Sequence, residues 1–196
     1  METLSRKSTK PNLLGVLSAT VVAGFIPLVI MASPAQSAPC PNPPAQSSSD
    51  PAWKQGLLCL VNHQRARYKR HQLRMSPQLN RGAQAYTNQM VGRHFFSHVT
   101  PSGGQLESRV RASGYTRHMY LMGIGENIYW TGMPTQTPQQ AFTAWMNSPH
   151  HRENMLDPSW RDFGAGITAG NPLPPSQTWT SQGWTMSQWF GIRSRT

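Results

Sequence analysis

The segment Gly-Ile-Gly-Glu-Asn-Ile-Tyr-Trp, at residues 123–130, indicates the fold class of this 196-residue chain. It is short, contains β-branched and aromatic residues, and has glycines near its start, which is typical of a β-strand. Segment 163–169 has a similar character, and after a turn-rich loop segment 179–192 is predicted to form a final strand or a hairpin. Helical patterns come first and strands follow, which predicts an α+β fold with an antiparallel sheet.

Three segments carry apolar residues at helical spacing. The first covers residues 51–70 and begins at Asp50-Pro51, which we interpret as the cap and the first turn. The second covers about 77–93 and begins after Ser76. The third runs from Thr137-Pro138 through Trp145. Their apolar faces are predicted to form the core.

The composition excludes several classes of protein. Seven Trp, six Phe and five Tyr supply enough apolar surface for a core, which rules out wholesale disorder. Seventeen Pro and sixteen Gly argue against a coiled coil or a simple helical bundle. Two cysteines are too few for a disulfide-built mini-protein or for a zinc module with cysteine ligands.

Residues 1–38 have the three parts of a secretory signal peptide: a basic head, an apolar middle and a small-residue exit. The alternative is an uncleaved anchor, which would be the chain's only attachment to a membrane. In both cases the rest of the chain is expected to be secreted or to lie in the periplasm or outside the cell. Residues 39–50 are predicted to be a flexible arm rich in Pro and Ser, and residues 51–196 a single domain.

Export changes the interpretation of Cys40 and Cys59. Outside the cytosol two thiols usually pair, and this pair would close a loop of about twenty residues and stabilise the fold by roughly 3 kcal/mol. We therefore predict a structural disulfide. Two free thiols, or a link between chains, are the alternatives.

Positive charge dominates the chain, whose formal net charge is +11. Between Asp50 and Glu107 there is no acidic residue, and eight Lys and Arg fall in this span. Such a distribution favours anionic partners, which for an exported protein are envelope polymers or lipid headgroups rather than nucleic acid. The alternative is a solvated basic surface that keeps the protein soluble.

Glu126 is the most informative acidic residue, because it lies inside an otherwise apolar strand, where an unpaired carboxylate would be costly to bury. His98 and His151 are two groups of suitable chemistry to meet it. Two imidazoles and a carboxylate can bind zinc or share protons. No local spacing rule joins the three residues, so the sequence alone indicates only that the fold could bring them together at a site for a divalent metal such as zinc. The alternative is histidines, buried or at the surface, that are satisfied by backbone groups.

Several motifs in the chain resemble the CAP superfamily, which includes the cysteine-rich secretory proteins, the venom allergens and the plant pathogenesis-related proteins. The resemblance covers about residues 53–191 and is strongest to the exported bacterial branch. Each motif is weak alone, but together they are specific. The matching motifs are Phe96-Ser97-His98, residues 109–115, Gly125-Glu126-Asn127-Ile128, residues 145–156, Gly164-Ala165-Gly166 and residues 184–191.

The resemblance implies an α-β-α sandwich, with a small antiparallel sheet flanked by helices. It also implies a cleft with two histidines and acidic residues that can hold a divalent metal in relatives. Carried over by motif, the metal positions are His98, Glu126 and His151. Asn127 and Ser148 belong to the same cleft. Ser148 stands where many eukaryotic members have a second glutamate, so the full set of two histidines and two glutamates is not reproduced.

Two classes of function follow from these observations. The first is a secreted binding module, whose cleft and basic face recognise a lipid, a glycan or an anionic envelope polymer. The second is a metal-dependent, peptidase-like hydrolase that uses the same cleft. No His-Glu-x-x-His helix and no Gly-x-Ser-x-Gly turn supports the hydrolase, so we favour binding. No specific nucleic-acid partner is expected, and we expect a monomer.

Overall fold

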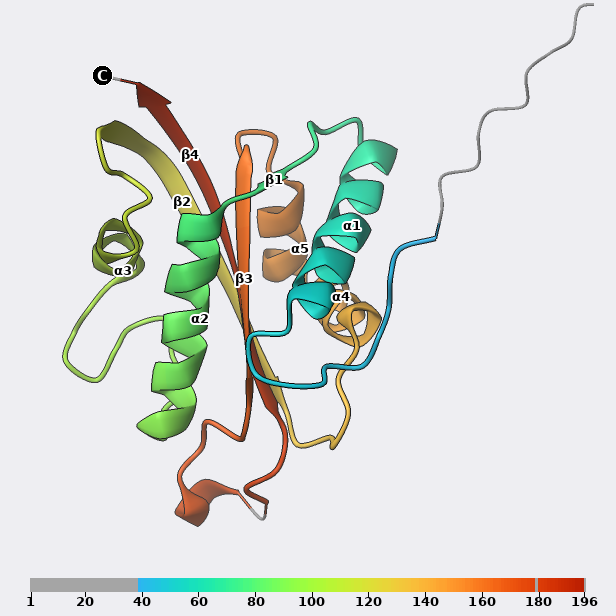
Figure 1. Cartoon of the computed structure of the whole chain (residues 1–196), viewed down its shortest axis with the longest axis vertical. Coiled ribbons are helices and arrows are strands. Elements are labelled where there is room, and N and C mark those ends of the chain that lie inside the picture. Colours follow the sequence, from blue (N-terminus) through green and yellow to red (C-terminus); the bar gives the residue numbers. More distant parts are fainter. Residues whose placement is uncertain (1–38, 179, 196) are drawn as a thin grey trace, which may run out of the picture. The chain divides into compact units, whose positions relative to one another are not determined.

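The computed structural model describes residues 39–178 and 180–195 (Figure 1). The predicted leader, residues 1–38, lies outside the described residues. Within the described part, no helix is long and apolar enough to cross a membrane. The helices are α1 (Pro51–Arg67), α2 (Pro77–Gly92), α3 (Leu106–Ala112), α4 (Pro138–Asn147), α5 (Pro149–Leu156) and the 3₁₀ turn η1 (Pro175–Gln177). The strands are β1 (Arg74–Met75), β2 (Met119–Thr131), β3 (Asp162–Ala169) and β4 (Trp184–Arg195).

The four strands form one sheet in the order β1-β3-β4-β2. The long strands β3, β4 and β2 pair antiparallel, as the sequence predicts. The sheet as a whole is mixed, because the two-residue strand β1, which was not predicted from the sequence, pairs parallel to β3. The last strand begins at Trp184 and not at the predicted residue 179, because Gly183 directly before it has a positive φ (133°), which lies outside the strand conformation.

Two apolar cores cover the two faces of the sheet, which confirms the α-β-α sandwich (Figure 1). Helices α1, α4 and α5 pack on one face, where Phe190 of β4 is fully buried. Helices α2 and α3 pack on the other face, where the neighbouring residue Trp189 is fully buried. Helix α2 lies directly on β3, since a Cβ atom at Gly164 or Gly166 would meet the α2 backbone at 2.3–2.4 Å.

The three predicted helices begin where the sequence indicates. Asp50, Ser76 and Thr137 cap α1, α2 and α4, each accepting backbone N–H bonds on its side-chain oxygen. The segment that follows α4 forms the separate helix α5, which was not predicted. The break falls at Ser148, which is extended (φ −98°, ψ 119°) because a residue before proline disfavours the helical conformation.

The arm at residues 39–50 is fastened to the domain by a disulfide, a buried side chain and backbone hydrogen bonds. The predicted disulfide joins Cys40 to Cys59 of α1. Ala45 is buried, and its N–H donates to the Gln136 carbonyl at 2.8 Å. The carboxylate of Asp50 accepts a backbone N–H bond from residue 46, which precedes it, and from residues 52 and 53, which follow it. Burial opposes the charged form of Asp50, but these N–H bonds and the charge of Lys54 outweigh it and hold its pKa below the usual value.

Candidate functional site

Glu126 lies on β2 opposite Trp189 of β4, and its side chain is only 2% exposed. Its Oε1 accepts bonds from the Arg109 guanidinium at 2.8 Å and from the Trp189 indole N–H at 2.8 Å. Its Oε2 lies 2.9 Å from His98 Nδ1 and 3.2 Å from Arg109. Both carboxylate oxygens are therefore fully engaged. We call Glu126, His98, Arg109 and Trp189 the Glu126 cluster.

Arg109 of α3 supplies the positive charge that makes the burial of Glu126 tolerable. Its side chain is 11% exposed, and the guanidinium carbon lies 3.4 Å from the centre of the Tyr86 ring. Such a stacked cation is attracted by the ring face. Arg109 also donates to the backbone carbonyl of His98, so one guanidinium holds both Glu126 and the loop that carries His98. This role was not predicted, although an acid inside an apolar strand is itself a signal that a cation must lie nearby.

Tyr86 of α2 fixes the same loop at the residue before His98. Its hydroxyl donates to the carbonyl of Ser97. Burial raises the pKa of Tyr86 to about 12, so the hydroxyl stays protonated and remains a donor at physiological pH. The His98 imidazole, 54% exposed, is thus held from its Nδ1 side and remains accessible to solvent.

Asn127, the next residue on β2, belongs to a neutral polar network on the opposite face of the sheet. Its Nδ2 donates to the backbone carbonyl of His151 and to Gln188 Oε1, both at 3.0 Å. Its Oδ1 accepts a bond from Asn154 of α5 at 2.9 Å. Asn154 therefore connects α5 to β2. Gly125 makes room for it, since a Cβ there would lie 2.4 Å from Asn154 Oδ1.

His151 lies on α5, which packs on the other face of the sheet from Glu126. Burial lowers the pKa of His151, and the charges of His98 and His150 lower it further. The structure therefore brings His98 and Glu126 into direct contact. It connects His151 to the same strand through the Asn127 amide. Ser148, the fifth predicted residue, forms the junction of α4 and α5, and its side chain makes no cap bond there.

The predicted metal ligands do not converge closely. Among the described residues, one group of three His, Cys, Asp or Glu side chains has all its ligand atoms within 4.8 Å, namely Cys40, Cys59 and His63, whose two sulfurs form the disulfide. His98, Glu126 and His151 do not form such a group. Arg109 already neutralises Glu126, so this carboxylate does not fit as a metal ligand in the observed arrangement. The predicted zinc site thus stays a prediction, and we derive no step through a metal.

The fold and the site define an α-β-α sandwich domain with a buried acid at the centre of β2. Comparison with known proteins identifies its family. The sequence profile of the Cysteine-rich secretory protein family (CAP) matches residues 58–174. The chain belongs to this family, as its motifs indicate.

Individual relatives support the same assignment. The chain is 27% identical over 135 residues to the uncharacterized protein YkwD of Bacillus subtilis, and the match covers 69% of this chain and 48% of YkwD. The chain thus spans about half the length of this relative.

Two solved structures share the fold. One is an extracellular protein of Bacillus anthracis that contains an SCP domain, with a TM-score of 0.55 and 23% identity, covering 73% of this chain and 40% of that one. The other is an outer surface protein of Borrelia burgdorferi, with a TM-score of 0.55 and 17% identity, covering 70% of this chain and 90% of that one.

Proposed function

We propose that this CAP domain is an exported, non-catalytic binding module that holds an anionic component of the cell envelope. The observation that carries the proposal is the uneven distribution of positive charge between the two ends of the sheet. One end of the sheet gathers cationic side chains, and the strands at the other end have none. We call the first end the cationic pole; it comprises Lys69, Arg70, Arg74, Arg117, Arg161, Arg193 and Arg195.

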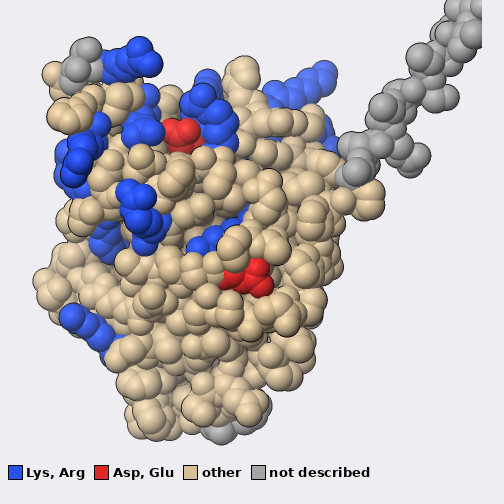
Figure 2. Space-filling model, in the orientation of Figure 1, with Lys and Arg blue, Asp and Glu red and all other residues tan. Residues whose placement is uncertain are grey.

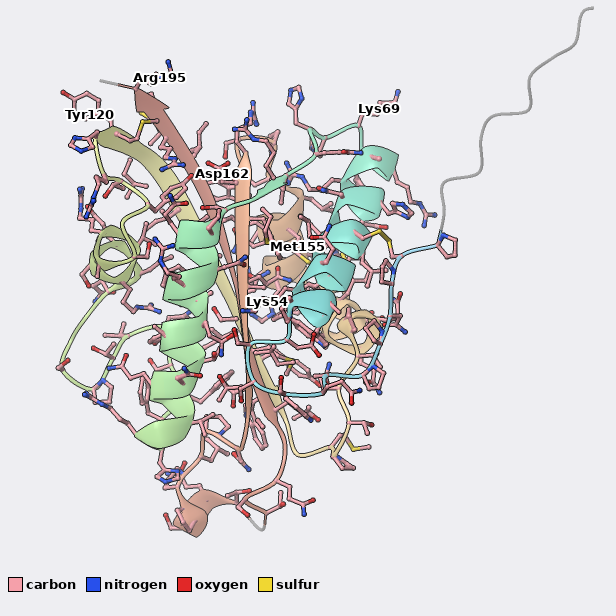
Figure 3. All side chains as sticks on the ribbon, viewed as in Figure 1. Lys54, Lys69, Tyr120, Met155, Asp162 and Arg195 are labelled. Atoms are coloured by element: carbon pink, nitrogen blue, oxygen red, sulfur yellow. A yellow bond between two sulfur atoms is a disulfide. The ribbon has the colours of Figure 1, made fainter. Side chains whose placement is uncertain are left out.

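The strand register explains why residues far apart in sequence share this pole. Arg74 of β1 pairs with Asp162 at the start of β3, and Arg195 at the end of β4 pairs with Met119 at the start of β2. Figure 3 shows Arg195 and Lys69 at this end, with Asp162 between them. Asp162 offsets only part of the positive charge of the pole, because this carboxylate, 12% exposed, contacts just Arg74 and Arg193 among its cationic side chains.

The opposite end of the sheet is uncharged. There β2 ends at Thr131, β3 ends at Ala169 and β4 begins at Trp184. Segments 127–151 and 163–192, which supply this end, contain no Lys, Arg, Asp or Glu. Figure 2 shows the same contrast, with blue side chains gathered in the upper part of the molecule. A field of one sign at one end orients the protein toward an anionic surface.

The Glu126 cluster supports binding over hydrolysis. A carboxylate acts as a general base through an oxygen that is free to accept a proton, and in the observed arrangement both oxygens of Glu126 are engaged by Arg109, Trp189 and His98. The extracellular and outer-surface descriptions of two structural relatives support an extracellular location for this chain. The hydrolase alternative predicts turnover of peptide or ester substrates that Glu126→Gln abolishes, and such a result would overturn the proposal.

Adsorption to isolated cell walls and to phosphatidylglycerol-containing vesicles tests the proposal. The variant Arg70→Ser/Arg195→Ser removes two exposed charges from the pole. Each Lys or Arg near an anionic surface contributes about 1 kcal/mol, so we expect adsorption to vesicles to weaken roughly 30-fold and to fall steeply with salt.

The matched control is Arg93→Ser/Arg111→Ser, which removes the same charge from exposed positions outside the pole. It should adsorb nearly as well as the unchanged protein. Equal weakening in the two variants would show that net charge and not the pole governs adsorption. Adsorption that salt leaves unchanged would also count against the proposal.

A further inference from the structure

A hollow of about 460 Å³ lies between α2 and α3, beside the Glu126 cluster. Small residues form much of its wall: Gly82 and Ala85 of α2 and Ala112 of α3. Tyr86 and Arg109 also line it. Gly82 cannot carry a larger side chain, because a Cβ there would lie 2.2 Å from the Trp189 ring. The two helices thus leave a space with mainly apolar walls, in the size range of small-molecule sites.

A second hollow of about 480 Å³ continues from the first toward the cationic pole. The two share Arg81, Ala112 and Ser113 as lining residues, so they adjoin where the Arg81 guanidinium donates to the Ser113 carbonyl. The second hollow is polar, and Arg117 and Arg193 also line it. Among the described residues that line either hollow, none is Asp or Glu. We call the two hollows together the α2–α3 groove.

We propose that the α2–α3 groove binds a single-chain amphiphile with an anionic head, with the alkyl chain along Ala85 and Ala112 and the head among Arg81, Arg117 and Arg193. The proposal rests on the proposed function, because it names one chemical class of envelope component that the cationic pole would accept. Apolar walls at one end and guanidinium groups at the other match the two halves of such a ligand.

The three arginines that line the second hollow differ in how far their side chains are free to bind a ligand. Arg193 is committed to the fold, since its guanidinium lies 4.3 Å from the centre of the Tyr115 ring and 3.8 Å from Asp162. Arg81 is exposed and its guanidinium donates to the Ser113 carbonyl at 3.3 Å. Arg117 is exposed at the same end. Arg81 and Arg117 are therefore the side chains that would bind the head, and the charge of Arg193 would add to the field there.

Calorimetric titration with dodecyl phosphate, below its micelle concentration, tests the proposal on the purified protein. Dodecyl maltoside has the same alkyl chain with a neutral head, and inorganic phosphate has the head without the chain. We expect dodecyl phosphate to bind at one site and at least about tenfold more tightly than either partial probe, since both halves of the groove contribute. Equal affinity for dodecyl phosphate and dodecyl maltoside would contradict the proposal that the ligand has an anionic head.

Ala85→Trp fills the apolar half from an exposed position on α2 and should weaken dodecyl phosphate binding at least about tenfold. Ala66→Trp makes the same change at an exposed position on α1, outside the groove, and should bind as the unchanged protein does. Thermal unfolding of the two variants reports that each is folded. Unchanged affinity in a folded Ala85→Trp variant would overturn the site.

Arg81→Ser/Arg117→Ser should weaken dodecyl phosphate binding and leave dodecyl maltoside binding unchanged. The pole variant Arg70→Ser/Arg195→Ser removes the same charge outside the groove and should keep its affinity for dodecyl phosphate. The two proposals can fail separately. Loss of amphiphile binding with intact adsorption in Ala85→Trp identifies the groove, whereas adsorption that ignores the pole variant contradicts only the proposed function.

Discussion

The two faces of β2 bury polar side chains by different means. Side chains of successive strand residues point to opposite faces, so Glu126 faces α2 and α3 while Asn127 faces α5. Glu126 is held by an ionic contact to Arg109 at 2.8 Å, and Asn127 by amide hydrogen bonds to Gln188 and Asn154. One face buries a charge pair, and the other buries a network with no formal charge.

This difference sets what each face can tolerate. A buried ion pair is costly to break, because removal of one partner leaves the other charge uncompensated. A neutral network loses only the hydrogen bonds that are removed, together with any strain that the substitution introduces. Comparable substitutions on the two faces should therefore have different costs, and the charged face should be the more sensitive.

Arg109→Leu should have the largest effect. It leaves Glu126 buried without its cation, which costs about 3–5 kcal/mol of unfolding free energy, measured by urea denaturation. The double variant Glu126→Gln/Arg109→Leu should be more stable than Arg109→Leu alone, because no buried charge remains.

Arg111→Leu is the matched control, since it lies on the same helix and pairs with Glu107 where both side chains are 57% exposed. It should cost no more than about 1 kcal/mol. If Arg109→Leu were no more destabilising than Arg111→Leu, the Glu126 cluster would not be the ionic core described above.

Gly125→Ala tests the neutral face and should have an intermediate effect. Its methyl group would lie 2.4 Å from Asn154 Oδ1 and would push α5 away from β2, at a cost of about 1–3 kcal/mol. Gly92→Ala is the control, because a Cβ at Gly92 meets nothing within 4 Å and its backbone lacks the positive φ that favours glycine. Equal unfolding free energies for the two variants would show that α5 is not packed tightly at Gly125.

Helix starts, the strand around Glu126 and the disulfide could be predicted, because each depends on residues close together in the sequence or on residue type. Asp50, Ser76 and Thr137 each precede a proline and cap the helix that follows, so the starts of three helices could be predicted. The strand around Glu126 was predicted from its residue types, and the disulfide from the expected export of the chain. Ser148-Pro149 carries a signal of the same kind as the three caps, for the break between α4 and α5, which was not predicted.

The partners in the site could not be predicted in the same way. Arg109 is one of many arginines in the chain, and only the packing of α3 against Tyr86 selects it as the partner of Glu126. The placement of His98 and Glu126 in one cleft was expected from the family resemblance and not from any spacing along the chain. The position of His151 depends on how α5 docks, which no spacing along the chain determines. Strand β1 has only two residues, too few for a period-two pattern to identify.

His151 gives the smallest expected effect and links the two faces. Its pKa is lowered by burial and by the charges of His98 and His150, so the unfolded chain binds a proton more readily than the folded one. Stability should therefore be fully retained above the unfolded pKa of about 6.5 and fall as the pH drops below it. We expect the melting temperature to fall less between about pH 7.5 and about pH 5 in His151→Gln than in the unchanged protein.

His63→Gln, which replaces an exposed histidine on α1, should leave this pH dependence unchanged and is the control. The comparison isolates the protonation of His151, because each variant removes one imidazole and the pKa of the His151 imidazole is lowered by burial. If His151→Gln and His63→Gln gave the same pH dependence, the environment of His151 would not depress its protonation. Neither the burial of the ring nor the charges of His98 and His150 would then act on His151 as described above.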